Sequence, residues 1–162
     1  MKIVENLNNI ETLKFNFIQI AFDKKENGVC YLKRPHFLKC IYKDKNQKEI
    51  FVNRKNLVIY HKTFNKTYFY PVSKSFFINI LDKKKFETLV FKGSINFEKD
   101  SYQIKYSEED KGEIVFLFDK INFDLSGWEI TDLNGNYTIF KIDNLSKNQS
   151  FDKKIFNIPT IN

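Results

Sequence analysis

Residues 29–43 read VCYLKRPHFLKCIYK. Pro35 has no N–H to give to a strand ladder, so it belongs in a turn between two strands at 29–34 and 37–43. In a hairpin centred on Pro35, two residues whose numbers add up to 70 face each other, which places Cys30 opposite Cys40. Opposed residues have Cβ atoms within about 5.5 Å, so this pair can form a disulfide. We predict the bridge for an oxidising compartment; the alternative is two reduced, buried cysteines in a reducing one.

Short alternating runs continue on both sides of this hairpin. Turn signals are expected at Asn27-Gly28 and at Leu133-Asn134-Gly135-Asn136. So many short strands in sequence order favour antiparallel neighbours in a sheet that curls or closes. The further strands predicted are 12–22, 48–53, 57–62, 67–71, 92–99, 101–106, 112–119, 121–131 and 136–144.

Three segments have helical periodicity instead. Residues 2–10 carry an apolar stripe, and residues 73–91 predict two short helices that are broken near Asp82. A helical turn is expected at 151–155. We find neither an internal repeat nor a linker, so the sequence predicts one domain over 1–162, mainly β with short helices (α+β).

Composition excludes several classes of protein. The 162 residues include 18 Phe and 19 Ile but one Ala, which argues against an all-α bundle. With only five Gly and no Gly-rich motif, neither a P-loop nor a dinucleotide site is expected. The net charge of +7 comes from 25 Lys and two Arg. It reflects either a compositional bias or attraction to an anionic partner or membrane surface. The shortage of Arg argues against nucleic-acid binding.

No constellation of residues supports catalysis. His36 and His61 are isolated, and the two cysteines do not have a zinc-site spacing. The acidic run at 108–110 is typical of a solvated turn. We therefore predict a protein that is not an enzyme and holds neither a metal nor a cofactor. No apolar run is long enough to span a bilayer, and residues 1–5 do not resemble a signal peptide.

The aromatic surplus has two interpretations. Several strands are apolar on both faces, as in the run 57–60. This pattern is typical of an ordinary core between a sheet and helices. It also fits a concave sheet, lined by Phe and Ile, that holds an apolar ligand under a helical lid.

Several motifs, taken in order, resemble the LolA family of periplasmic carriers, which take lipoproteins to the outer membrane. The match is carried by Phe17-Ile18-Gln19, by the turn segment 33–42 with its Arg34-Pro35 pair, and by Ile59-Tyr60. It continues through Ile80-Leu81, the stretch 128–138 (WEITDLNGNYT) and Phe156-Asn157-Ile158-Pro159. The chain departs from the family at Asn53-Arg54-Lys55-Asn56, where an Asp-Gly turn is common, and in its two cysteines.

The resemblance implies an incomplete antiparallel β-barrel of about 10–11 strands with short helices as its lid. It implies a monomeric chaperone that takes lipoprotein acyl chains from an inner-membrane ABC transporter and passes them on, where one exists, to an outer-membrane acceptor lipoprotein. Periplasmic localisation would follow if a signal peptide has been removed. The expected acyl-chain cavity is formed by Phe15, Phe17, Leu32, Leu38, Tyr42, Phe76, Ile80 and Leu81.

Arg34 is the expected latch of that lid. The resemblance implies that its side chain hydrogen-bonds to the lid helices and holds the empty cavity closed. Its five donors suit the free carbonyls at a helix C-terminus. Two other functions stay open: a lipoprotein or lipid sensor of the envelope with the same half-barrel, and a basic β-module that binds anionic polymers.

Overall fold

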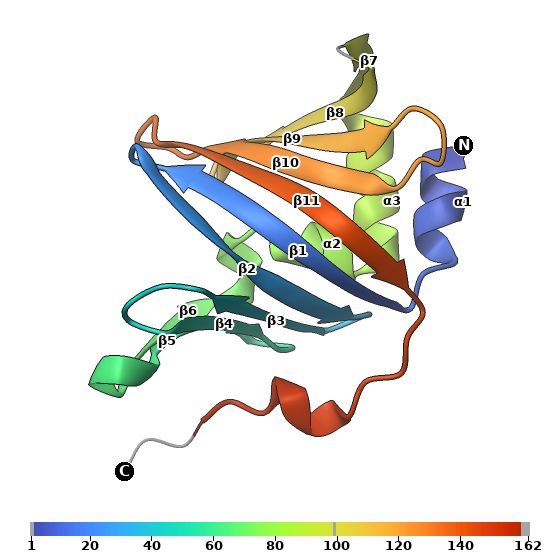
Figure 1. Cartoon of the computed structure of the whole chain (residues 1–162). Helices are drawn as coiled ribbons and strands as arrows, with labels where there is room; N and C mark the ends of the chain where they lie inside the picture. The colour runs from blue at the N-terminus through green and yellow to red at the C-terminus, as the bar shows by residue number, and fades with distance from the viewer. Residues whose placement is uncertain (1, 99, 160–162) are drawn as a thin grey trace.

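The computed structural model describes residues 2–98 and 100–159, which form one antiparallel sheet and several short helices (Figure 1). The sheet has eleven strands in the order β6-β5-β4-β3-β2-β1-β11-β10-β9-β8-β7. Their bounds are β1 Thr12–Ala21, β2 Lys24–Lys33, β3 Phe37–Tyr42, β4 Lys48–Val52, β5 Asn56–His61, β6 Lys66–Pro71, β7 Ser94–Glu98, β8 Ser101–Glu108, β9 Gly112–Asp119, β10 Leu125–Thr131 and β11 Tyr137–Lys147.

Two meanders make up this sheet. β1 to β6 pair in sequence order, β7 to β11 do the same, and β1 joins the halves by pairing with β11. β6 and β7 stand at the two ends of the strand order, so within the described residues the barrel is not closed. The prediction of a mainly β, incomplete barrel with short helices is confirmed.

The helices lie against the concave side of the curled sheet (Figure 1). α1 covers Lys2–Asn8, α2 covers Phe77–Leu81 and α3 covers Lys83–Lys92, with 3-10 turns η1 at Lys62–Phe64, η2 at Val72–Lys74 and η3 at Lys153–Phe156. The break near Asp82 is confirmed, because its side chain caps α3 by accepting a hydrogen bond from the Lys85 N–H. None of the described helices is long and apolar enough to cross a bilayer.

The hairpin of β2 and β3 has the register that Pro35 predicts, with Cys30 opposite Cys40. The turn expected at Asn27-Gly28 is wrong: β2 begins at Lys24, and the chain reverses at Phe22-Asp23, both at positive φ. Gly28 lies inside β2 instead. A glycine is needed there because a Cβ would clash with the Ile41 carbonyl oxygen.

The second corrected boundary is the start of β10. The sequence predicts a strand over 121–131, whereas β10 begins at Leu125. The Asp119 carboxylate accepts hydrogen bonds from the backbone N–H groups of Ile121 and Asn122, and this turns the chain before the strand begins. These two hydrogen bonds also hold the pKa of Asp119 below its usual range.

A continuous core fills the space between the concave sheet and the helices. Phe86 of α3 lies within 6.3 Å of Phe116 and 6.0 Å of Phe118, measured between ring centroids. Phe15 and Phe17 of β1 pack on Phe140 of β11. The helices therefore cover the apolar inner face that an unclosed barrel would otherwise expose to water.

Candidate ligand-binding cavity and its lid

An apolar cavity of about 210 Å³ lies between α2 and the inner faces of β9 and β10. β-strand alternation decides which side chains reach it, because Ile114, Phe116, Trp128 and Ile130 all point to the concave face. The lining residues are Lys74, Ser75, Phe76, Phe77, Ile80, Lys111, Ile114, Phe116, Trp128, Ile130 and Asp132.

Trp128 is the rigid part of the cavity wall. Its ring stacks on Phe140 with centroids 4.2 Å apart and planes 3° apart. Phe77 from α2 meets it edge-on at 6.0 Å, and Phe116 approaches it edge-on at 6.4 Å. Such aromatic contacts contribute about 0.5–1.5 kcal/mol each beyond area burial. The wall is thus fixed on the sheet side, while the opposite side belongs to the short helix α2.

Charged side chains gather where the cavity meets solvent. Lys74 lies 3.6 Å from Asp110, and Lys111 lies 3.3 Å from Glu108. Hydrogen bonds from the Asn136 side chain and backbone lower the pKa of Asp132. An apolar interior with a charged mouth suits an amphipathic ligand, whose tail is buried and whose polar end stays in water.

The residues predicted from the sequence fall into two groups. Phe76 and Ile80 line the cavity directly. The other six are buried in the continuous core: Phe15, Phe17, Leu32, Leu38 and Tyr42 of the sheet, and Leu81 of α2. The aromatic and aliphatic wall of β9 and β10 was not predicted, although the alternation of 112–119 indicates its inward-facing positions.

Arg34 joins the β2–β3 turn to two helix ends. Its side chain is only 4% exposed. Nη1 donates to the Leu7 carbonyl at 2.6 Å, near the end of α1, and Nε donates to the carbonyl of Leu81, the last residue of α2, at 3.2 Å. Both acceptors lie in the last turn of a helix, where the dipole favours a cation. The Leu7 carbonyl also accepts from the Ile10 N–H at 3.1 Å. The acceptors expected from the sequence lay only on the lid helices within 73–91, so the contact with α1 is an addition.

Burial lowers the pKa of Arg34 to about 10, although the charges of Glu11 and Asp82 oppose this shift. The guanidinium therefore stays protonated at neutral pH. Nη2 is buried and has no hydrogen-bond partner among the described residues. The side chain is thus held at two of its donors while a third is left desolvated, which reduces the net gain from the contact.

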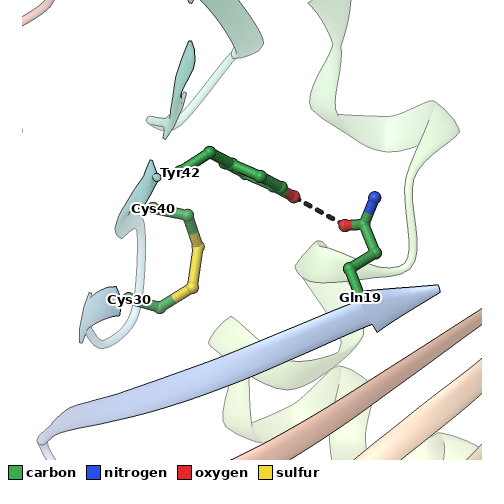
Figure 2. The surroundings of a disulfide bond; sticks show 4 residues. All are labelled: Gln19, Cys30, Cys40 and Tyr42. Carbon is green, nitrogen blue, oxygen red and sulfur yellow. Dashed lines mark hydrogen bonds between the residues drawn. A yellow bond between two sulfur atoms is a disulfide. The ribbon is translucent and has the colours of Figure 1, made fainter. Parts of the chain in front are cut away.

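Cys30 and Cys40 form a disulfide across the β2–β3 hairpin (Figure 2). Beside it, the Tyr42 hydroxyl donates to Oε1 of Gln19 at 2.6 Å, which links β3 to β1 over the intervening β2. Burial raises the pKa of Tyr42, assisted by the carboxylates of Glu26 and Asp44. The Phe17 and Tyr42 rings meet 4.8 Å apart above Gly28, which has no side chain to separate them.

The described part of the chain holds no group of three or more His, Cys, Asp or Glu side chains placed to bind a metal ion. Thr12, Arg34 and Asn79 are its buried polar residues. Arg34 faces helix carbonyls and does not approach the charged mouth. The arrangement offers an apolar space, enclosed between α2 and the sheet, that an apolar group could occupy.

Comparison with known families gives one match over most of the chain. The family model described as "Outer membrane lipoprotein carrier protein LolA" matches residues 8–159. A search of curated proteins finds no similar sequence.

Solved structures with the same fold share little sequence with this chain. An uncharacterised conserved protein from Thermus thermophilus has a TM-score of 0.64 at 8% identity, with 97% of this chain and 92% of that chain covered. A LolA superfamily protein from Nitrosomonas europaea has a TM-score of 0.52 at 9% identity, with 96% of each chain covered. The MucA/MucB complex from Pseudomonas aeruginosa gives 0.55 at 9% identity, covering 98% of this chain and 62% of that one.

Proposed function

Since the chain belongs to the LolA family of outer membrane lipoprotein carrier proteins, we propose that it is a periplasmic chaperone for the acyl chains of lipoproteins. It takes them after their release from the inner membrane and carries them to the outer membrane. The observation that supports this most directly is the aromatic cavity under α2. The C-terminal end of α2 is hydrogen-bonded to Arg34 of the β2–β3 turn.

The size of the cavity supports the interpretation of this form as the empty one. Ligand pockets enclose about 300–1,000 Å³, more than the about 210 Å³ found here. Each CH₂ removed from water contributes about 0.8 kcal/mol, so several long acyl chains provide enough free energy to displace a short helix and break its hydrogen bonds. In the proposed cycle α2 moves away when the acyl chains enter and returns when they leave.

The partners follow from this role. An inner-membrane lipoprotein-releasing ABC transporter would supply the cargo, and an acceptor lipoprotein or the outer membrane itself would receive it. The Cys30–Cys40 disulfide supports an extracytoplasmic location, since disulfides persist in oxidising compartments such as the periplasm.

Trp128 provides a direct test, because it is the only tryptophan and lines the cavity. We expect a brominated fatty acid to quench its fluorescence in a saturable way, and a purified triacylated lipoprotein to reverse the quenching. If neither ligand changes the fluorescence of the folded protein, acyl carriage is excluded.

A charge placed in the cavity should weaken that binding. We expect Ile130→Lys to weaken fatty-acid binding by about two orders of magnitude, because an ammonium group against an acyl chain loses its hydration. Ile139→Lys is the matched control: Ile139 is also half-buried but, opposite Glu129, it faces the outer side of the sheet. Equal losses in both variants would contradict the assignment of this cavity.

A further inference from the structure

A cluster of lysines and exposed aromatic side chains lies at one end of the sheet, separate from the cavity wall. It is formed by three segments, 22–26, 43–48 and 62–66, which we call the basic rim. They contain seven lysines against three carboxylates. The lysines are Lys24, Lys25, Lys43, Lys45, Lys48, Lys62 and Lys66.

Hydrogen bonds join these segments into one surface. The backbone N–H groups of Lys62 and Thr63 donate to the carbonyls of Gln47 and Asn46 at 3.3 and 3.2 Å. The Lys43 N–H donates to the Asn27 carbonyl at 2.8 Å, next to the first segment. Lys48 reaches Glu26 at 3.2 Å. With one of the three carboxylates paired in this way, six of the lysines are left exposed to solvent.

Two aromatic side chains project from the same surface. Phe22 is 78% exposed at the tip of the β1–β2 hairpin, and Phe64 is 60% exposed in η1. Phe22 also has a φ of 52°, a left-handed conformation that bulky residues rarely adopt and in which Asn or Gly is usual. Neither packing nor backbone preference explains a phenylalanine at this position, which indicates that its side chain contacts a partner outside the protein.

The basic rim shares its end of the sheet with the mouth of the cavity. Ala21 pairs with Thr138, so the β1–β2 turn lies beside the β10–β11 turn that carries Asp132 (Figure 1). Leu133, in that second turn, is 64% exposed. The acidic run 108–110 occupies the β8–β9 turn at the far side of the mouth, so the positive potential is concentrated on the β1–β6 half.

We propose that the basic rim docks the protein on a membrane surface rich in anionic lipid. Exposed lysines are attracted to the negative surface potential of such a membrane, and exposed aromatic tips insert at its interface. The mouth of the cavity would then face the bilayer. This inference goes beyond acyl carriage, and it is tested on the empty protein.

The test is flotation of the ligand-free protein with vesicles of phosphatidylcholine, with and without phosphatidylglycerol. We expect binding only to the anionic vesicles and a loss of binding as salt is raised. Phe22→Asn should weaken it about tenfold, since one interfacial phenylalanine is lost. Lys24→Gln with Lys25→Gln should weaken it about fivefold per lysine.

Two matched variants at the opposite end of the sheet are the controls. Ile121 is as exposed as Phe22, at 78%, and Lys153 and Lys154 are an exposed pair in η3. We expect Ile121→Asn and Lys153→Gln with Lys154→Gln to bind the vesicles as the wild type does. Phe22→Asn should melt no lower than the wild type, because Asn tolerates the left-handed conformation.

Three outcomes would overturn the proposal. The wild type could fail to float with anionic vesicles, or the control variants could lose as much binding as the rim variants. A single-stranded oligonucleotide could also bind as tightly as the vesicles and depend on Phe22 in the same way, which would identify a polyanion site. Fatty-acid quenching of Trp128 does not depend on any of these results, so failure of docking leaves acyl carriage standing.

Discussion

Arg34→Leu is expected to accept lipoprotein normally and to release it about a hundredfold more slowly. The two hydrogen bonds from Arg34 to the ends of α1 and α2 exist in the closed, empty form. Hydrogen bonds of charged groups contribute about 1.5–3 kcal/mol each, and the unpaired Nη2 offsets part of this. A net loss of about 3 kcal/mol from the empty form favours the loaded form by about two orders of magnitude. The measurement is transfer from pre-loaded protein to an acceptor membrane.

Arg54 offers the matched control for this experiment, because it is the chain's other arginine and lies exposed in the β4–β5 turn. Arg54→Leu should transfer its cargo at the wild-type rate. Arg34→Lys should be intermediate, since it keeps the charge but loses the planar fork. Wild-type release from Arg34→Leu would show that Arg34 only stabilises its turn. A sensor of lipoprotein, in contrast to a carrier, would transfer nothing even as the wild type.

Removal of the disulfide should lower the melting temperature by about 6–12 °C. Cys30 and Cys40 close a short loop, with a sequence separation of 10. Loop closure of this length stabilises the folded state by about 3 kcal/mol in the chain-entropy model, and 1 kcal/mol shifts the midpoint of a domain of this size by about 2–4 °C.

The measurement is thermal unfolding of the wild type with and without a reductant, beside Cys30→Ala with Cys40→Ala. The double variant should melt at one temperature in both conditions, while the wild type should lose stability only when it is reduced. Thiol counting on the oxidised, denatured wild type should find no free thiol. Two titratable thiols would contradict the bridge.

The succession of antiparallel strands along the chain could be predicted because most turns are marked locally, whereas the pairing of β1 with β11 was not predicted. Pro35 cannot continue a strand and so marks the β2–β3 turn, and Asp82 caps α3 and so marks the break between the two helices. The β1–β2 turn could not be predicted, because Phe22 rarely adopts a positive φ and Asp23 alone is a weak turn signal. The turn signal Asn27-Gly28 instead serves a close approach between strands, which depends on the neighbouring strand and not on local sequence.

The cavity was predicted less completely than the fold. Alternation tells which side chains of a strand face inward, but it does not tell which of them a helix then covers. Phe15 and Leu38 face inward and are covered by other core residues, whereas Trp128 and Ile130 face inward and line the open space. The position of α2 along the sheet decides between these outcomes. That position depends on contacts distant in sequence, among them the hydrogen bond of Arg34 to Leu81.

The separation of β6 from β7 has a consequence for the proposed carrier, because it decides how the sheet can adapt to a cargo. A closed barrel has a fixed girth, because every strand is bonded on both sides and expansion would break a ladder. Here the two edge strands, β6 and β7, can move apart with all ten strand pairings of the described sheet intact. Expansion then works only against side-chain packing, which yields in small steps, while hydrogen-bonded ladders resist as a whole. In the proposed carrier, this freedom would let one protein fit acyl groups of different length and number, with an elasticity that a closed barrel lacks.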